Sequence, residues 1–149
     1  MKIKKLLSII VLLFVMNGFA QGSATEITTK KGIRYITTSI DYPITGTYMF
    51  KGAEPIVQLN GGGTGIYQLH ELPKRAMIWG IECNESGDPK FTKGYDNAAY
   101  TLWYQYTTST EDDTDLDWKD VEFSIHFNTS KMFIQGERVK DFTVDSAKK

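Results

Sequence analysis

Apolar and polar residues alternate along much of the chain after residue 32. The alternation is clearest over residues 121–127, where Val121, Phe123, Ile125 and Phe127 are separated by polar side chains. A period of two is typical of a strand that buries one face. Short runs rich in β-branched and aromatic residues predict further strands at 33–36, 44–50, 55–59, 65–70, 76–83, 98–107, 131–135 and 138–144.

The segments between these runs have the composition of tight turns. Residues 60–65 read Asn-Gly-Gly-Gly-Thr-Gly, and Asn and Gly tolerate the positive φ that hairpin turns demand. No part of the sequence after residue 20 keeps apolar residues at helical spacing for three turns. A series of about eight or nine short strands predicts an all-β fold. We expect an antiparallel up-and-down barrel of about eight strands, with a β-sandwich as the alternative.

Residues 1–20 carry the pattern of a secretory signal peptide. Lysines at the start precede an apolar run over 6–16, and the small residues Gly18 and Ala20 precede an expected cleavage before Gln21. The run is shorter than the roughly 20 residues that span a bilayer. We therefore expect a periplasmic or extracellular protein with no membrane anchor after cleavage. The expected divisions of the mature chain are a flexible lead-in over 21–32, a β-barrel domain over 33–144 and a C-terminal tail over 145–149.

Composition and charge narrow the classes of function. The chain has 149 residues, of which 41% are hydrophobic and 23% charged, and this describes one ordinary domain. A formal net charge of −1 argues against a nucleic-acid partner. The single cysteine, Cys83, excludes an internal disulfide and a zinc site of the CxxC type.

An acidic stretch offers one candidate for metal chemistry. Asp113, Asp115 and Asp117 have the spacing of the first ligands of a calcium loop. Trp118 and Ser124 stand where an EF-hand needs glycine and glutamate, so an EF-hand is excluded. A looser calcium site remains an alternative to a solvated loop.

No motif in the sequence indicates an enzyme. The two histidines, His70 and His126, lie on different predicted strands without a neighbouring ligand. The sequence also lacks GxSxG and HExxH. We therefore expect a non-enzymatic protein without a metal or a cofactor.

A three-residue motif resembles the signature of a known family of barrels. Gly46-Thr47-Tyr48 begins the first convincing strand and resembles the Gly-x-Trp signature of the lipocalin-like (calycin) barrels, with Tyr48 in place of the tryptophan. In that superfamily a basic residue near the last strand packs over the signature aromatic, and Arg138 stands at a comparable place. The resemblance implies an eight-stranded barrel that these two residues close and that holds a small molecule in a cavity.

Aromatic residues are concentrated on one predicted strand. On 98–107, Tyr100, Leu102, Tyr104 and Tyr106 share one face and Trp103 lies on the other. We expect an apolar or amphipathic small molecule in the barrel, oriented by tyrosine hydroxyls. The alternative is an interaction subunit of an envelope or extracellular assembly that docks through outward aromatics, which requires a large apolar surface patch. The residues expected to line the cavity are Trp79, Tyr100, Leu102, Tyr104, Phe123 and Ile125.

Overall fold

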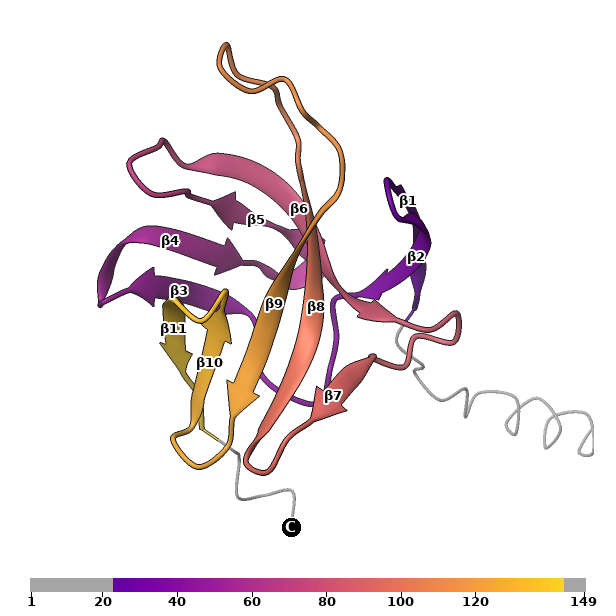
Figure 1. Cartoon of the computed structure of the whole chain (residues 1–149), viewed down its shortest axis with the longest axis vertical. Helices are drawn as coiled ribbons and strands as arrows, with labels where there is room; N and C mark the ends of the chain where they lie inside the picture. Colours follow the sequence, from indigo (N-terminus) through magenta and orange to yellow (C-terminus); the bar gives the residue numbers. More distant parts are fainter. Residues whose placement is uncertain (1–22, 144–149) are drawn as a thin grey trace, which may run out of the picture.

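Strands dominate the computed structural model, which describes residues 23–143 (Figure 1). The signal peptide expected over 1–20 and the tail expected over 145–149 lie outside the described residues. Within residues 23–143, no helix is long and apolar enough to cross a membrane. The strands are β1 (Thr25–Thr29), β2 (Gly32–Thr37), β3 (Gly46–Phe50), β4 (Ala53–Leu59), β5 (Thr64–Tyr67), β6 (Arg75–Cys83), β7 (Phe91–Lys93), β8 (Asn97–Tyr106), β9 (Lys119–His126), β10 (Lys131–Ile134) and β11 (Arg138–Asp141).

Eight of these strands close into an antiparallel barrel. Its strands follow the chain in the order β3, β4, β5, β6, β8, β9, β10 and β11, and β11 pairs back with β3. The β6–β8 pairing closes the ring between the two halves. The prediction of an all-β, up-and-down barrel of about eight strands is confirmed, and the sandwich alternative is not adopted.

Three further strands lie outside the barrel. β1 and β2 form a hairpin whose second strand pairs with β6, from Tyr35 opposite Cys83 to Thr37 opposite Ile81. The expected loose lead-in over 21–32 therefore contains most of a hairpin, and that prediction was wrong in this respect. Ile27, the only large apolar residue there, is buried against the barrel. This tertiary contact orders a segment that looks polar in isolation.

Residues 60–65 form the tight turn that their sequence predicts. The backbone N–H of Asn60 donates to the carbonyl of Thr64 at 2.9 Å, and Gly62 has φ of 82° in the short 3₁₀ turn Gly61–Gly63. A positive φ of this kind costs glycine little. The glycine-rich stretch is thus the predicted connection between two strands, and a strand follows it.

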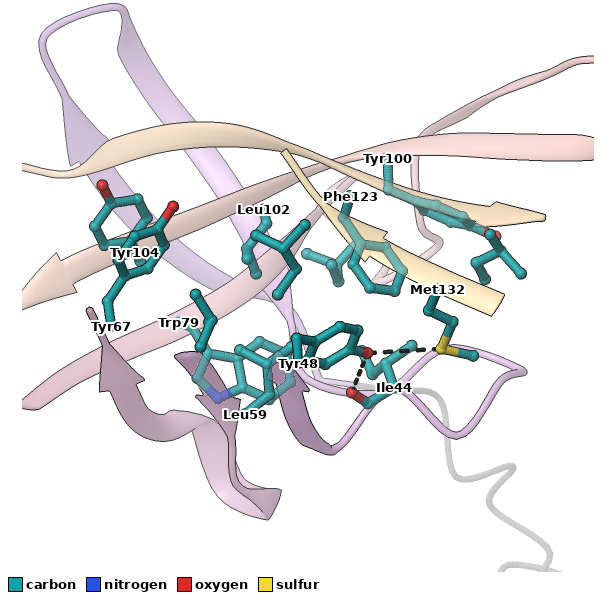
Figure 2. Packing of buried hydrophobic residues seen from close by; sticks show 14 of the residues in the cluster. Ile44, Tyr48, Leu59, Tyr67, Trp79, Tyr100, Leu102, Tyr104, Phe123 and Met132 are labelled. Carbon is teal, nitrogen blue, oxygen red and sulfur yellow. Dashed lines mark hydrogen bonds between the residues drawn. The ribbon is translucent and has the colours of Figure 1, made fainter. Parts of the chain in front are cut away.

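The inside of the barrel is a packed core (Figure 2). Alternation on β8 is as predicted, because Tyr100, Leu102, Tyr104 and Tyr106 all belong to the core. Burial of aromatic and aliphatic side chains is the main stabilising contribution to such a fold.

Trp103, on the outer face of β8, is covered by the chain itself. Only 2% of its surface is exposed, because Ile27 and Ile36 of the β1–β2 hairpin and Trp118 pack on it. Its indole N–H donates to Glu82 Oε2 at 2.7 Å. This outward aromatic therefore forms a second, smaller core and is not available to a partner.

The two ends of the barrel differ. At one, called the loop end here, lie the β5–β6 loop (68–74) and the long β8–β9 loop (107–118), which extends away from the barrel (Figure 1). At the other end the chain passes from β2 to β3 through residues 38–45, called the crossing segment. Ile40, Tyr42 and Ile44 of this segment pack on the core.

Candidate functional site

The six residues predicted to line a cavity are all brought together, but as core. Trp79, Tyr100, Leu102, Tyr104, Phe123 and Ile125 are buried in one cluster. The indole N–H of Trp79 donates to the carbonyl of Thr64 at 2.8 Å. Only Tyr100 and Tyr104 lie toward the ends of the cluster, on opposite sides (Figure 2). These side chains pack against one another, so a ligand has to be sought at the barrel ends.

Tyr48 anchors the crossing segment to the barrel. Its hydroxyl donates to the carbonyl of Ile44 at 2.5 Å and lies 3.6 Å from the sulfur of Met132 (Figure 2). Its ring meets Phe123 edge to face, with the ring centroids 6.0 Å apart. Burial raises the pKa of the Tyr48 phenol well above its usual value. Tyr48 thus fastens the crossing segment to the barrel core.

Arg138 forms its cation–aromatic contact with Tyr67, and its expected role as the closing partner of Tyr48 stays a prediction. Arg138 begins β11 at the loop end, where it lies opposite Phe50, and its guanidinium packs 5.3 Å from the ring centre of Tyr67. β3 and β11 are antiparallel, so the start of one lies beside the end of the other.

Lys140 covers the start of the Gly46–Tyr48 stretch. A Cβ built on Gly46 would lie 2.5 Å from Lys140 Cε, so only a glycine leaves room for that side chain. The Lys140 ammonium donates to the carbonyl of Pro43 at 3.1 Å.

Arg138 belongs to a group of aromatic and basic side chains at the loop end, called the loop-end cluster. Tyr67 stacks on Tyr104 with ring centres 4.4 Å apart and an interplanar angle of 13° (Figure 2). Tyr104 meets Tyr106 edge to face at 5.6 Å, and the Arg75 guanidinium lies 3.6 Å from the centre of the Tyr106 ring. The cluster consists of Tyr67, Arg75, Tyr104, Tyr106 and Arg138.

Hydrogen bonds fix part of this cluster. Arg138 Nη2 donates to the carbonyl of Gln68 at 2.8 Å, and Nη1 donates to Gln135 Oε1 at 3.3 Å. The Tyr67 hydroxyl donates to the same Gln135 oxygen at 2.9 Å. The Arg138 side chain is only 1% exposed, so its charge is held almost entirely out of water.

Three buried polar atoms in the cluster have no hydrogen-bond partner among residues 23–143. They are the Nε atoms of Arg75 and Arg138 and the hydroxyl of Tyr106. Leaving a buried donor unpaired costs about 1–3 kcal/mol, more for a charged group. In the described part of the chain, these unpartnered atoms are found only at the loop end. The arrangement favours an acceptor group from outside the chain.

The protonation states leave the cluster rich in donors. Burial raises the pKa of Tyr67 to about 12 and also raises the pKa of Tyr106, so both phenols keep their protons at neutral pH. The pKa of Asp113 is lowered by the backbone N–H of Asp115 and by Arg75, whose Nη1 lies 2.7 Å from Asp113 Oδ2. Asp113 is therefore ionised and accepts from one edge of the Arg75 guanidinium.

A pocket of about 200 Å³ opens over this cluster, between the β5–β6 and β8–β9 loops. Its apolar wall is formed by Leu69, Leu72 and Pro73. The polar side consists of Arg75, Tyr106, Thr110, Asp112 and Asp113. Leu72 is 52% exposed and also borders a hollow of about 440 Å³ on the other side of its loop. The β5–β6 loop thus separates two hollows at the same end of the barrel.

The acidic stretch gives no support to the calcium alternative. Asp117 lies 3.0 Å from the ammonium of Lys30, and Asp115 lies within 3.6 Å of Lys30 and Lys119. Asp113 pairs with Arg75. No group of three or more His, Cys, Asp or Glu side chains within the described residues is arranged to hold a metal ion. These carboxylates therefore pair with bases and tie the β1–β2 hairpin to the β8–β9 loop.

Sequence reasoning missed Tyr67 and Arg75 and placed Tyr106 only as an inward residue. Tyr67 and Arg75 flank the β5–β6 loop, and Tyr106 ends β8, so all three lie where strands enter loops. Such strand ends meet at one end of an up-and-down barrel. That topological fact was the only indication available, because the three residues form no motif in sequence.

Comparison of the chain with models of known protein families, with curated proteins and with solved structures gives no match in any of the three. The closed eight-stranded antiparallel barrel is consistent with a lipocalin-like fold. What the protein does must therefore be inferred from the geometry of its own sites.

Proposed function

We propose that this chain is a secreted, lipocalin-like, non-enzymatic protein that binds a small amphipathic molecule with an acidic head group at the loop end of its barrel. One observation carries the proposal: Arg75 and Tyr106, each with a buried polar atom that has no partner, line a pocket with an apolar wall, and Arg138, with a third such atom, belongs to the same loop-end cluster. Pockets at barrel mouths with a few convergent polar groups are common ligand sites.

The charges of Arg75 and Arg138 favour a ligand with an acidic head group. Arg138 is a buried cation whose nearest carboxylate is Glu137, a half-exposed side chain 3.6 Å away. Arg75 shares its charge with Asp113 but keeps Nε free. A carboxylate accepts from guanidinium N–H groups and from the phenol at once, and hydrogen bonds to charged groups contribute about 1.5–3 kcal/mol each. An ammonium group could pair with Asp112 or Asp113, which also line the pocket, but it would leave the Nε atoms of Arg75 and Arg138 without an acceptor.

The apolar wall of the pocket favours a ligand whose second part is an apolar chain. Leu69 and Leu72 are among the large hydrophobic residues that the described chain exposes. Covering a leucine side chain fully stabilises a complex by about 1.5–3 kcal/mol. The pocket volume of about 200 Å³ lies below the roughly 300–1,000 Å³ of typical ligand sites, which favours a short chain.

A larger ligand would require movement of the β5–β6 loop. Gln68, at its start, accepts from Arg138 through its carbonyl and donates from Nε2 to the carbonyl of Leu72 at 3.3 Å. A head group that binds Arg138 competes with the first of these contacts. Movement of the β5–β6 loop and ligand binding are therefore coupled through the Arg138 side chain.

Calorimetric titration with three probes of equal chain length tests the proposal. We expect hexanoate to bind, hexan-1-ol to bind about tenfold or more weakly, and hexylamine not to bind. Tyr106→Phe keeps the ring and removes the hydroxyl, so it weakens hexanoate binding about tenfold. Tyr35→Phe is the matched control, because the Tyr35 hydroxyl contacts only Glu26 and Glu85 on the far side of the molecule.

Two results would count against this function. Equal affinity for hexanoate and hexylamine would show that the guanidinium groups do not select the ligand. Isolation of the protein with a tightly bound partner chain and no small molecule would favour the assembly subunit, whose docking surface would then lie at the free edges of β1 or β7.

A further inference from the structure

A second hollow, at the opposite end of the barrel, has a different chemistry. β6 pairs with β8 only as far as Ile81 opposite Leu102, and beyond that point β7 takes its place beside β8 (Figure 1). The inner face of β7 and the crossing segment enclose a groove of about 450 Å³, called the crossing-end groove. Its volume lies within the range usual for small-molecule sites.

Two pairs of aromatic rings line this groove. Phe91 of β7 lies opposite Tyr100 of β8, with ring centres 5.3 Å apart. Tyr42 of the crossing segment packs on Phe127 at 5.5 Å. Phe91 is 55% exposed although it belongs to a three-residue strand. Aromatic rings from four separate segments of the chain therefore line the groove, and Phe91 is the most exposed of them.

The polar groups around these rings are unengaged. Asp41 and Lys93 also line the groove. Within residues 23–143, neither of them forms an ion pair or a side-chain hydrogen bond, and the hydroxyls of Tyr42 and Tyr100 have no protein partner. One carboxylate and one ammonium leave the groove without net charge, so neither a cation nor an anion is selected. A ligand that satisfies all four groups must carry both donors and acceptors.

We infer that the crossing-end groove binds a neutral saccharide ring. The apolar C–H face of a sugar stacks on aromatic rings, whose faces carry partial negative charge. Its hydroxyls donate to Asp41 and accept from Lys93, and either role suits the phenols of Tyr42 and Tyr100. An alkyl chain would bury these polar groups without partners, and a quaternary ammonium group, which has no hydrogen-bond acceptor, would leave Lys93 and the phenols without one. This site does not depend on the loop-end site.

The test is a titration followed by amide NMR shifts, with maltotriose, cellotriose and N,N′,N″-triacetylchitotriose as probes and choline as a comparison. At least one trisaccharide is expected to shift the amides of residues 40–42 and 91–100 and to bind more tightly than choline. Phe91→Ala and Asp41→Asn each weaken that binding by roughly tenfold or more. Phe91 and Asp41 are exposed, so the barrel core is left intact.

Two controls separate this site from its surroundings and from the loop end. Tyr95→Ala removes an aromatic ring that is 99% exposed on the adjacent turn and does not line the groove, so binding is unchanged. Tyr106→Phe, which impairs the loop-end site, also leaves sugar binding unchanged. The inference is overturned if no trisaccharide binds, if choline binds more tightly, or if Phe91→Ala and Asp41→Asn leave the affinity as it is.

Discussion

Gly80 of β6 sets how closely the β1–β2 hairpin approaches the barrel. A Cβ built on Gly80 would lie 2.7 Å from both Cβ and Cδ1 of Ile36 and 2.9 Å from its Cγ1. Cβ atoms do not tolerate contacts this short, so Gly80→Ala forces the hairpin outward or Ile36 into another rotamer. Trp103, opposite Gly80 in the β6–β8 register, lies beneath the same hairpin.

The size of the effect follows from two competing costs. Overpacking by one methyl group costs about 1–3 kcal/mol. Releasing the hairpin would expose Ile27, Ile36 and Trp103, and each of these burials stabilises the fold by about 1.5–3 kcal/mol or more. A small displacement of the hairpin therefore costs less free energy than its release from the barrel. We expect Gly80→Ala to lower the free energy of unfolding by about 2 kcal/mol, with a fall in Tm of roughly 6–10 °C.

Urea unfolding followed by tryptophan fluorescence measures both the stability and the surroundings of Trp103 and Trp118. The matched control is Gly61→Ala, because nothing lies within 4 Å of a Cβ at Gly61 and its φ is not positive. The control should stay within about 0.5 kcal/mol of the wild type. Equal stability of Gly80→Ala and Gly61→Ala would refute the tight packing of the hairpin on β6.

Four further changes test other parts of the structure. Tyr48→Phe removes a buried donor to the crossing segment and should lower the free energy of unfolding by about 1–3 kcal/mol in urea melts. Arg138→Met leaves the carbonyl of Gln68 without its donor, so it should lower the free energy of unfolding by about 1–3 kcal/mol in urea melts and abolish hexanoate binding in calorimetry. The pKa of Asp113 is lower in the folded chain than its unfolded value near 3.8. Its contribution to stability is therefore present above that value and is lost as the pH falls through the folded value. In urea melts, Asp113→Asn should reduce the change in the free energy of unfolding between pH 5 and pH 3. Burial raises the pKa of the Cys83 thiol, so Ellman's reagent should react with it slowly in native protein and quickly in denaturant.

The strands and the inward faces were predictable because they rest on local patterns. Val121, Phe123 and Ile125 alternate with polar residues on β9, and Phe123 and Ile125 are buried as that pattern requires. The register of an up-and-down barrel follows from short turns between successive strands. The sequence therefore predicted an up-and-down barrel of about eight strands, although the run at 33–36 belongs to β2, outside the barrel.

The ends of the barrel were not predictable in the same way. Arg138 lies opposite Phe50, two residues along β3 from Tyr48, and the sequence does not show that its guanidinium packs on Tyr67. β1 is ordered by the contact of Ile27 with Trp103, which lies more than seventy residues away in the chain. Residues predicted to line a cavity fill the core, because patterning reports burial and not the space left between side chains.

The most direct test of the loop-end site is native mass spectrometry of the protein purified from the medium or envelope of its own cells, repeated after denaturation. The account predicts an additional mass that is lost on denaturation and is identified in the released fraction as an amphipathic carboxylic acid. A bound molecule that is neutral or cationic, or a chain that carries no extra mass and does not bind added hexanoate, would contradict it.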